Sequence, residues 1–292
     1  MKITEAFERG EFVITAEVGP PKGFHIEKML EEAKEYLSGI TAVNVTDNQS
    51  SVMRLGSLAT CKALKDEGLT PIFQMTCRDR NRIALESDLL SAALFGIENL
   101  LLLTGDHTKL GDHPQAKPVF DLDSVSLIHA VKQLESGVDL GGNELVGEPP
   151  KFAKGAVVSP CSDSLDAQLA KMERKVAAGA EYFQTQAVYE PEKFIQFMEK
   201  AKQFGKPVQL GIVIPKSVGM CRYMNANVAG IHIPEDMINE LKADKEKTKA
   251  GITGVEIAAR VIRECRPYCQ GVHIMAMGWE SKVPGLLEQA GL

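Results

Sequence analysis

Short apolar runs alternate with longer amphipathic segments throughout the chain. Residues 99–103 (NLLLL) are apolar after the first position, which is typical of a strand buried on both faces of a parallel sheet. Seven other runs, most of them rich in β-branched or aromatic residues, are 13–17, 42–47, 71–77, 154–160, 182–188, 207–214 and 271–277. We therefore predict eight strands.

The segments between these strands have helical periodicity. Predicted helices are 25–37, 54–67, 83–95, 121–135, 165–178, 191–204, 217–227, 234–248, 253–266 and a last helix that runs to the end of the chain. Thr253, with Glu256 three residues later, fits a capping box at the start of its helix. Segments 107–118 and 137–150 are rich in Gly and Pro and lack periodicity, which predicts long loops of the kind that often bind ligands.

Strict alternation of strand and helix predicts a parallel sheet in an α/β protein. Eight strands in 292 residues favour a closed (β/α)8 barrel, the TIM barrel, over an open sheet. Because no linker or change in composition divides the chain, we predict a single domain over residues 1–292.

Composition narrows the range of partners. The net charge is −6 and no basic tract is present, so we expect no nucleic-acid partner. No apolar stretch is long enough for a membrane span. A charged residue follows Met1 directly, so we expect no secretion signal and a cytoplasmic chain. The six cysteines are expected to be reduced and buried. Cys265 and Cys269 have helical spacing, but no cluster completes a metal site with them.

In a barrel, the carboxyl ends of the strands meet at one mouth, where ligands bind. The polar residues at these ends are Glu17, Thr46, Asp47, Gln74, Thr76, Asp106, Ser159, Gln184, Gln186 and His273. Gly105 allows a turn or a close approach to a ligand, and Asp106 then either binds that ligand or only caps the next turn. Two acids at one mouth, Glu17 and Asp106, suit proton transfer or recognition of a donor-rich heterocycle.

Residues 184 and 186 are both glutamines and share one face of their strand. An inward glutamine needs hydrogen-bond partners, which either a ligand or the other inward polar residues supply. The chain has no GxSxG, no P-loop, no HExxH and no GxGxxG after a strand, so these common catalytic and nucleotide-binding motifs are absent.

Four segments in the same order resemble the bacterial and archaeal methylenetetrahydrofolate reductases. They are 16–21 (AEVGPP), 76–81 (TCRDRN), 103–106 (LTGD) and 175–180 (KVAAGA), the last followed by Thr185 and Gln186. The resemblance covers nearly the whole chain. It implies a TIM barrel that holds non-covalent FAD and reduces 5,10-methylenetetrahydrofolate to 5-methyltetrahydrofolate in one-carbon metabolism and methionine supply.

The resemblance also implies roles for individual residues. Glu17 matches the family's acid, which helps to open the imidazolidine ring, Asp106 matches the aspartate near flavin and pterin, and Gln186 matches the pterin-binding glutamine. Implied cofactor-binding positions are Thr46, Gln74, Thr104, Gly105, Asp106, Ser159, Gln168 and Lys175. Among these, Gln74, Gln168 and Thr104 stand where well-studied members have histidine, aspartate and arginine.

The resemblance leaves the electron donor open between NAD(P)H and ferredoxin acting through a partner subunit. Segment 215–221 has no aromatic residue, whereas family members often place one there against nicotinamide or pterin. We expect a homo-oligomer or a hetero-complex. Two alternatives remain at this point: a flavin-free reductase, and a non-catalytic folate-binding subunit of a methyl-transfer complex.

Overall fold

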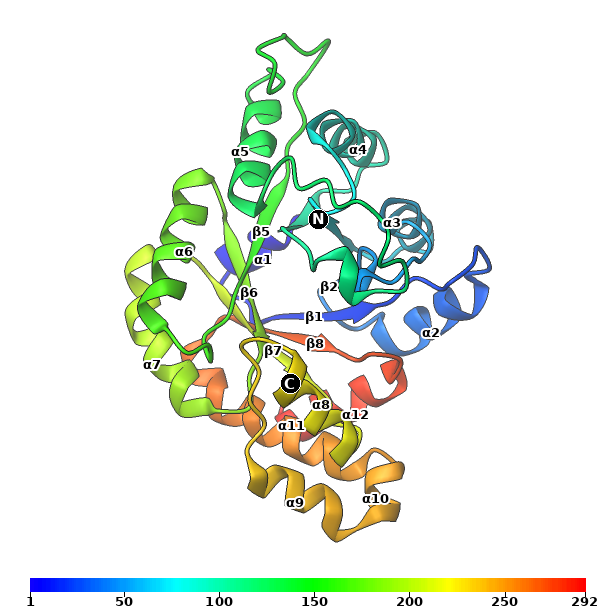
Figure 1. Cartoon of the computed structure of the whole chain (residues 1–292), viewed down its shortest axis with the longest axis vertical. Coiled ribbons are helices and arrows are strands. Elements are labelled where there is room, and N and C mark those ends of the chain that lie inside the picture. Colours follow the sequence, from blue (N-terminus) through cyan, green and yellow to red (C-terminus); the bar gives the residue numbers. More distant parts are fainter.

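Eight parallel strands pair in chain order, and β8 returns to β1 to close a barrel (Figure 1). The computed structural model describes residues 1–292. The strands are β1 (Val13–Val18), β2 (Ala42–Val45), β3 (Pro71–Thr76), β4 (Asn99–Leu103), β5 (Ala153–Val158), β6 (Tyr182–Ala187), β7 (Val208–Val213) and β8 (Gly271–Met275). All eight predicted strands are present, and the predicted single (β/α)8 barrel is confirmed.

Helices surround the strands on the outside of the barrel, except for the first helix, which covers its amino-terminal end (Figure 1). They are α1 (Ile3–Glu8), α2 (Glu27–Leu37), α3 (Ser57–Asp66), α4 (Arg82–Leu94), α5 (Ser124–Glu135), α6 (Leu165–Ala178), α7 (Pro191–Ala201), α8 (Val218–Asn227), α9 (Glu235–Ala243), α10 (Lys245–Lys249), α11 (Ile252–Cys265) and α12 (Val283–Ala290). None of them has both the length and the apolar character that a membrane span needs.

The structure adds one helix that was not predicted and corrects two helix predictions. The sequence did not indicate α1, which has only six residues and too few for a clear period. The predicted helix 234–248 is broken at Asp244, whose carboxylate accepts backbone N–H groups at the start of α10. Thr253 is not a cap, because α11 already begins at Ile252, after Gly251 at φ +80°.

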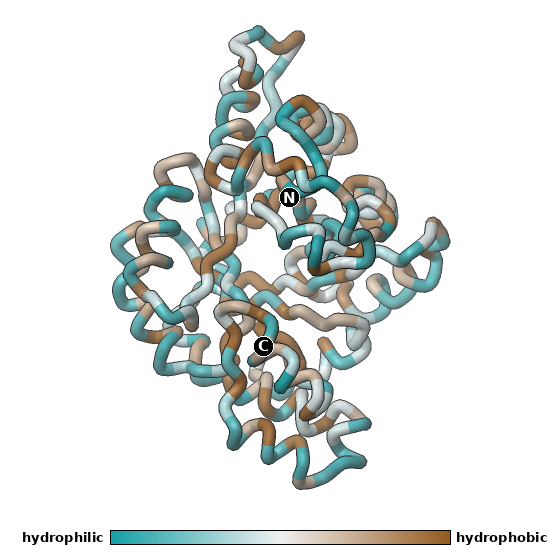
Figure 2. Tube along the Cα trace, viewed as in Figure 1, coloured by the Kyte–Doolittle hydropathy of each residue, from teal (hydrophilic) through white to brown (hydrophobic).

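Apolar side chains form two separate clusters. The larger one lies mainly between the strands and the helices, and in Figure 2 the outer turns of helices such as α7 are mainly hydrophilic. The smaller one plugs the amino-terminal end of the barrel and consists of Ile3, Ala6, Val13, Ala42, Ile72, Leu101, Ala153 and Tyr182. Above this plug the barrel interior is polar, with Thr15, Asn44, Gln184 and Gln209 all buried.

Candidate functional site

A cavity of about 420 Å³ opens at the carboxyl ends of the strands. Its lining includes every residue that the sequence and the resemblance singled out: Glu17, Thr46, Asp47, Gln74, Thr76, Thr104, Gly105, Asp106, Ser159, Gln168, Lys175, Gln184, Gln186 and His273. This mouth cavity has the size of a small-molecule site. A neighbouring cavity of about 480 Å³ shares Glu17, Thr46 and Gln49 with it.

A larger cavity of about 800 Å³ lies at the opposite end of the barrel, against α1 and the segments that lead into β6, β7 and β8. The amino-terminal face of a TIM barrel is usually concerned with stability rather than with ligand binding. None of the predicted site residues lies in this cavity. We therefore place the candidate site in the mouth cavity.

Glu17 projects from β1 into the mouth cavity and is 9% exposed. Its Oε1 accepts a hydrogen bond of 2.9 Å from Gln74 Nε2 and lies 3.4 Å from His273 Nε2. Its Oε2 has a longer contact, 3.5 Å, with Gln49 Nε2. One carboxylate oxygen is thus held by the barrel, and the other is available to a ligand.

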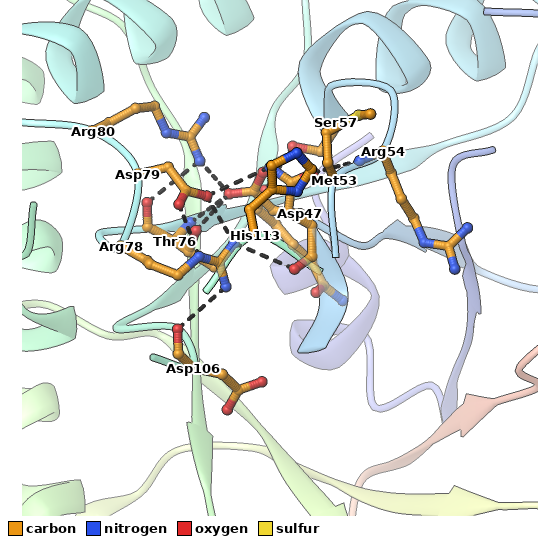
Figure 3. Close-up of polar contacts among 12 residues, drawn as sticks. Asp47, Met53, Arg54, Ser57, Thr76, Arg78, Asp79, Arg80, Asp106 and His113 are labelled. Carbon is orange, nitrogen blue, oxygen red and sulfur yellow. Dashed lines mark hydrogen bonds and ion pairs between the residues drawn. The ribbon is translucent and has the colours of Figure 1, made fainter. Parts of the chain in front are cut away.

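Asp106 follows Gly105 at the exit of β4. Gly105 has φ +91°, and a Cβ there would lie 2.9 Å from the Thr76 Cβ, so the turn requires glycine. The next turn, Thr108–Leu110, is capped by His107 and not by Asp106. The Asp106 carboxylate points away from Arg78 in Figure 3 and makes no hydrogen bond within the chain, so the capping alternative does not account for it.

The carboxylate of Asp47 is occupied by hydrogen bonds within the protein. Its Oδ2 accepts hydrogen bonds from the Thr76 backbone N–H (2.8 Å) and hydroxyl (2.9 Å), and it also pairs with Arg80. Arg80 in turn donates to Asp88 at 2.9 Å. Figure 3 shows Thr76 and Arg80 both in contact with Asp47. Asp47 and Thr76 therefore brace the exits of β2 and β3, although both line the cavity.

Arg78 was quoted within a sequence motif, but its role was not predicted. Its side chain is 2% exposed and forms a two-pronged pair with Asp79. It also donates to the backbone carbonyls of Asn48 (3.3 Å) and Asp106 (3.4 Å). A single guanidinium group therefore ties together the loops that leave β2, β3 and β4 (Figure 3).

The loop after β2 is strained. Asn48, Ser50 and Ser51 all have positive φ, between +46° and +62°. Such conformations cost roughly 1 kcal/mol or more each for residues other than glycine. The loop carries Gln49, which contacts Glu17, and sequence reasoning missed it because no turn motif marks it.

The two glutamines of β6 differ in their surroundings. Gln184 is buried and bonds reciprocally with Asn44, so for this residue the alternative of inward polar partners is correct. The pairing of β6 with β7 then shifts between Gln184 and Ala187. Gln186 makes only a local bond, to the Ala187 backbone N–H, and its side chain lines the mouth cavity.

The side of the cavity near β5 and α6 is basic. Lys175 Nζ donates to the Val157 carbonyl at 2.6 Å. Burial and the neighbouring charge of Lys171 lower the pKa of Lys175 to about 8. Gln168 accepts from the Ser159 N–H at 3.3 Å, and Thr104 accepts from the Ser124 N–H at 3.1 Å. This side of the cavity could hold an anionic group.

All six cysteines are free and buried, as predicted. None of them lines the mouth cavity. Cys269 Sγ lies 3.6 Å from the Cys265 carbonyl oxygen, and burial raises the pKa of both thiols. These residues are therefore packed as small apolar side chains.

The fold and the mouth cavity define a TIM-barrel protein with a polar site for a small molecule. The model of the methylenetetrahydrofolate reductase family matches residues 2–291. The chain belongs to this family.

Individual relatives agree with this assignment. The chain is 24% identical to 5,10-methylenetetrahydrofolate reductase of Escherichia coli over 265 residues, which are 87% of this chain and 82% of that protein. It is 25% identical to methylenetetrahydrofolate reductase 2 of Schizosaccharomyces pombe over 81% of this chain, but spans only 38% of that longer protein.

Solved structures share the fold. An uncharacterized protein from Clostridium thermocellum, described as binding two copies of 5-methyl-5,6,7,8-tetrahydrofolic acid, matches with a TM-score of 0.69 and 15% identity. The match covers 99% of this chain and 98% of that protein. Oxaloacetate acetylhydrolase matches with a TM-score of 0.56 and 13% identity, over 100% of this chain and 87% of that one. At these identities the likeness concerns the fold.

Proposed function

We propose that this protein is a flavin-dependent reductase that converts 5,10-methylenetetrahydrofolate to 5-methyltetrahydrofolate in one-carbon metabolism and methionine supply. One observation carries the proposal: Glu17 on β1, Asp106 at the exit of β4 and Gln186 on β6 line one cavity. Family membership and the folate named for the Clostridium thermocellum protein support it.

Glu17 is the proposed acid. Its Oε2 is the less restrained oxygen, and it would give a proton to the substrate nitrogen whose bond to the methylene carbon breaks. The electron pair of that bond goes to the nitrogen, and the carbon becomes an iminium that accepts hydride. Asp106 would accept N–H groups of the pterin ring, and Gln186 would offer both a donor and an acceptor to it.

The residues present fit FAD, the proposed cofactor. Thr46 Oγ1 is buried without a hydrogen-bond partner and lines the cavity, which fits a hydroxyl that bonds a ligand. Lys171 and Lys175 line the basic side without a carboxylate partner, which suits a pyrophosphate. Other proposed cofactor contacts are Gln74, Thr104, Gly105, Asp106, Ser159 and Gln168. When bound and reduced, the flavin would supply the hydride.

Electrons would reach this site from NAD(P)H or from ferredoxin through a partner subunit. Segment 215–221 at the exit of β7 offers no aromatic ring for a nicotinamide, which favours the partner route. A homo-oligomer or a hetero-complex remains part of the proposal.

The test is an anaerobic titration of the purified protein. We expect a flavin absorbance spectrum, natively or after reconstitution with FAD, that is bleached by 5-methyltetrahydrofolate. Glu17→Gln should lower reductase turnover about 100-fold or more while folate binding persists, because a general acid contributes on that order. Glu199→Gln, at the opposite end of the barrel, is the matched control and should leave turnover unchanged.

Each negative result has a meaning. A colourless protein that does not take up FAD but still reduces the folate would support the flavin-free alternative. Folate binding without turnover would support the non-catalytic subunit. Full turnover by Glu17→Gln would show that Glu17 is not the acid.

A further inference from the structure

A chain of hydrogen bonds runs through the polar interior of the barrel to His273, whose Nε2 lies 3.4 Å from Glu17 Oε1. It begins at Gln209 on β7, whose Nε2 lies 3.3 Å and 3.2 Å from the carbonyl oxygens of Val13 and Val272. These oxygens can only accept, so the Gln209 amide has one possible orientation, with Oε1 turned toward Gln184. Two backbone carbonyl groups thus determine the orientation of the Gln209 side-chain amide.

The orientation passes from Gln209 to Gln184. Gln209 Oε1 lies 3.1 Å from Gln184 Nε2, and an acceptor there requires the nitrogen of Gln184 to face it. The oxygen of Gln184 then faces Asn44 Nδ2 at 2.9 Å. Flipping either amide would place oxygen against oxygen or nitrogen against nitrogen, so both orientations are determined.

The orientations of these two amides determine how the hydroxyl group of Thr15 on β1 is hydrogen-bonded. Its hydroxyl oxygen lies 3.3 Å from Gln184 Nε2 and 3.2 Å from Gln209 Nε2, and both of these nitrogens only donate. The one acceptor within reach of the Thr15 proton is His273 Nδ1, at 3.0 Å. Thr15 therefore donates to His273, and Nδ1 of this histidine carries no proton.

We propose that this chain holds His273 as the neutral tautomer with its proton on Nε2, directed at Glu17 Oε1, and that Thr15 and His273 are positioning residues for Glu17. A histidine tautomer follows from the bond that its other nitrogen makes. His273 is 3% exposed, so it is largely shielded from water. Its Nε2 lies 3.4 Å from Glu17 Oε1.

The consequence concerns which oxygen of Glu17 carries the transferred proton. Gln74 Nε2 donates to Oε1 at 2.9 Å, and His273 Nε2 faces the same oxygen, whereas the donor at Oε2, Gln49 Nε2, is at 3.5 Å; Oε2 is therefore the freer oxygen to carry a proton. The proton resides on Oε2, toward the cavity. This step rests on the proposed function, whereas the tautomer itself does not.

The first experiment reads the tautomer by nitrogen NMR. The protein, labelled with ¹⁵N-histidine, is measured at about pH 8, above the ordinary imidazole pKa, and the six histidines are assigned with His273→Gln. We expect His273 Nδ1 in the unprotonated range and Nε2 in the protonated range. If the wild-type spectrum shows the opposite tautomer or a doubly protonated ring, the proposal is wrong, and no variant is needed to show it.

Two variants of Thr15 separate the hydroxyl from the space it fills. Thr15→Val removes the donor and should shift His273 toward the Nδ1–H tautomer, whereas Thr15→Ser should retain the wild-type pattern. With folate and flavin, Thr15→Val should lower kcat roughly tenfold with little change in KM, because it perturbs a proton-transfer group, and Thr15→Ser should restore kcat. An unchanged His273 spectrum in Thr15→Val would contradict the chain.

The outcomes distinguish this inference from the proposed function. If no preparation reduces the folate but the spectra are as expected, the proposed function fails and the tautomer chain stands. If the reductase is active and Thr15→Val shows the same kcat as wild type, the positioning role of Thr15 fails and the proposed function stands.

Discussion

At the scale of single residues, Gly105 and Lys175 have environments that set them apart from others of their type. Gly105 combines a positive φ with a tight contact to Thr76. Lys175 is largely withdrawn from water and has only a backbone carbonyl as its acceptor. Each therefore supports a prediction that depends on local physics.

Gly105→Ala should destabilise the protein by about 2–3 kcal/mol, because the new Cβ adds a 2.9 Å contact to the cost of φ +91°. Gly278→Ala is the matched control: it has φ +85° but nothing within 4 Å of its Cβ, so it should cost about 1 kcal/mol. Urea denaturation measures both. Equal losses would show that the contact with Thr76 is relieved at no cost.

The affinity for FAD, the proposed cofactor, should fall above about pH 8. In the ligand-free fold Lys175 loses its proton near its lowered pKa of about 8, whereas an anionic pyrophosphate favours the protonated form. Binding above that pH requires proton uptake, so the Kd should rise up to about tenfold per pH unit. Lys171, Arg174 and Asp123 modulate this pKa.

Quenching of FAD fluorescence, titrated between about pH 7 and pH 9.5, measures this dependence. Lys175→Met should bind more weakly and lose the pH dependence. A wild-type Kd that does not change across the range would argue against a contact between Lys175 and the pyrophosphate.

At the scale of elements, two small assemblies hold the barrel ends in place. Asp47 and Arg80 join β2 to β3 and α4 at the mouth. At the other end, α1 closes the barrel with Ile3 and Ala6, both fully buried, and Asn99 Oδ1 accepts the Ile3 N–H at 2.8 Å.

Asp47→Asn should lower the free energy of unfolding by about 3 kcal/mol, because it leaves the largely buried Arg80 with a weaker partner. The side chain of Asp47 is 5% exposed, whereas that of Asp88, the other partner of Arg80, is 31% exposed. Asp88→Asn should therefore cost under about 1 kcal/mol. Chemical denaturation that gives the two variants the same stability would contradict the bracing role of Asp47.

Ile3→Ala should cost about 2–4 kcal/mol, since it removes a fully buried side chain from the plug at the amino-terminal end. Thr4→Ala, in the same helix but partly exposed, should cost much less. Both are measured by urea denaturation. A loss for Ile3→Ala as small as that for Thr4→Ala would mean that α1 does not seal the barrel in solution.

At the scale of the whole molecule, the pairing of β1 with β8 removes both sheet edges. Thr15 pairs with His273, and Ala16 with Ile274, so the first and last strands are as fully bonded as the inner ones. The same closure brings the positioning chain together, because Thr15 and His273 are 258 residues apart in sequence.

Closure predicts uniform protection from hydrogen exchange. Backbone amides of β1 and β8 should exchange as slowly as those of β3 and β4, because a closed barrel has no edge strand. Mass spectrometry of peptides that cover these four strands measures the rates. Faster exchange in both β1 and β8 would indicate that the barrel opens at this seam.

Much of this fold could be predicted from the sequence because the strands and turns depend on local residue patterns. The run 99–103 was predicted as a buried strand because each of its apolar faces needs cover, and short runs mostly rich in β-branched or aromatic residues located the other seven strands. The tight turn after β4 was indicated by its glycine, Gly105. The polar residues at the strand ends were also predicted to share one cavity, because strand ends in a parallel barrel meet at one face, whereas the loop that carries Gln49 was not.

The sequence did not predict the hydrogen-bond partner of each polar side chain, because that partner is usually distant in sequence. Asp47 and Asp106 look alike as acids at strand ends, but the fold gives one an arginine and leaves the other open. Strand periodicity predicts that Gln184 and Gln186 share a face, but the pairing of β6 with β7 is irregular between Gln184 and Ala187, and the two side chains have different surroundings. Periodicity is local, whereas burial and hydrogen-bond partners belong to the assembled barrel.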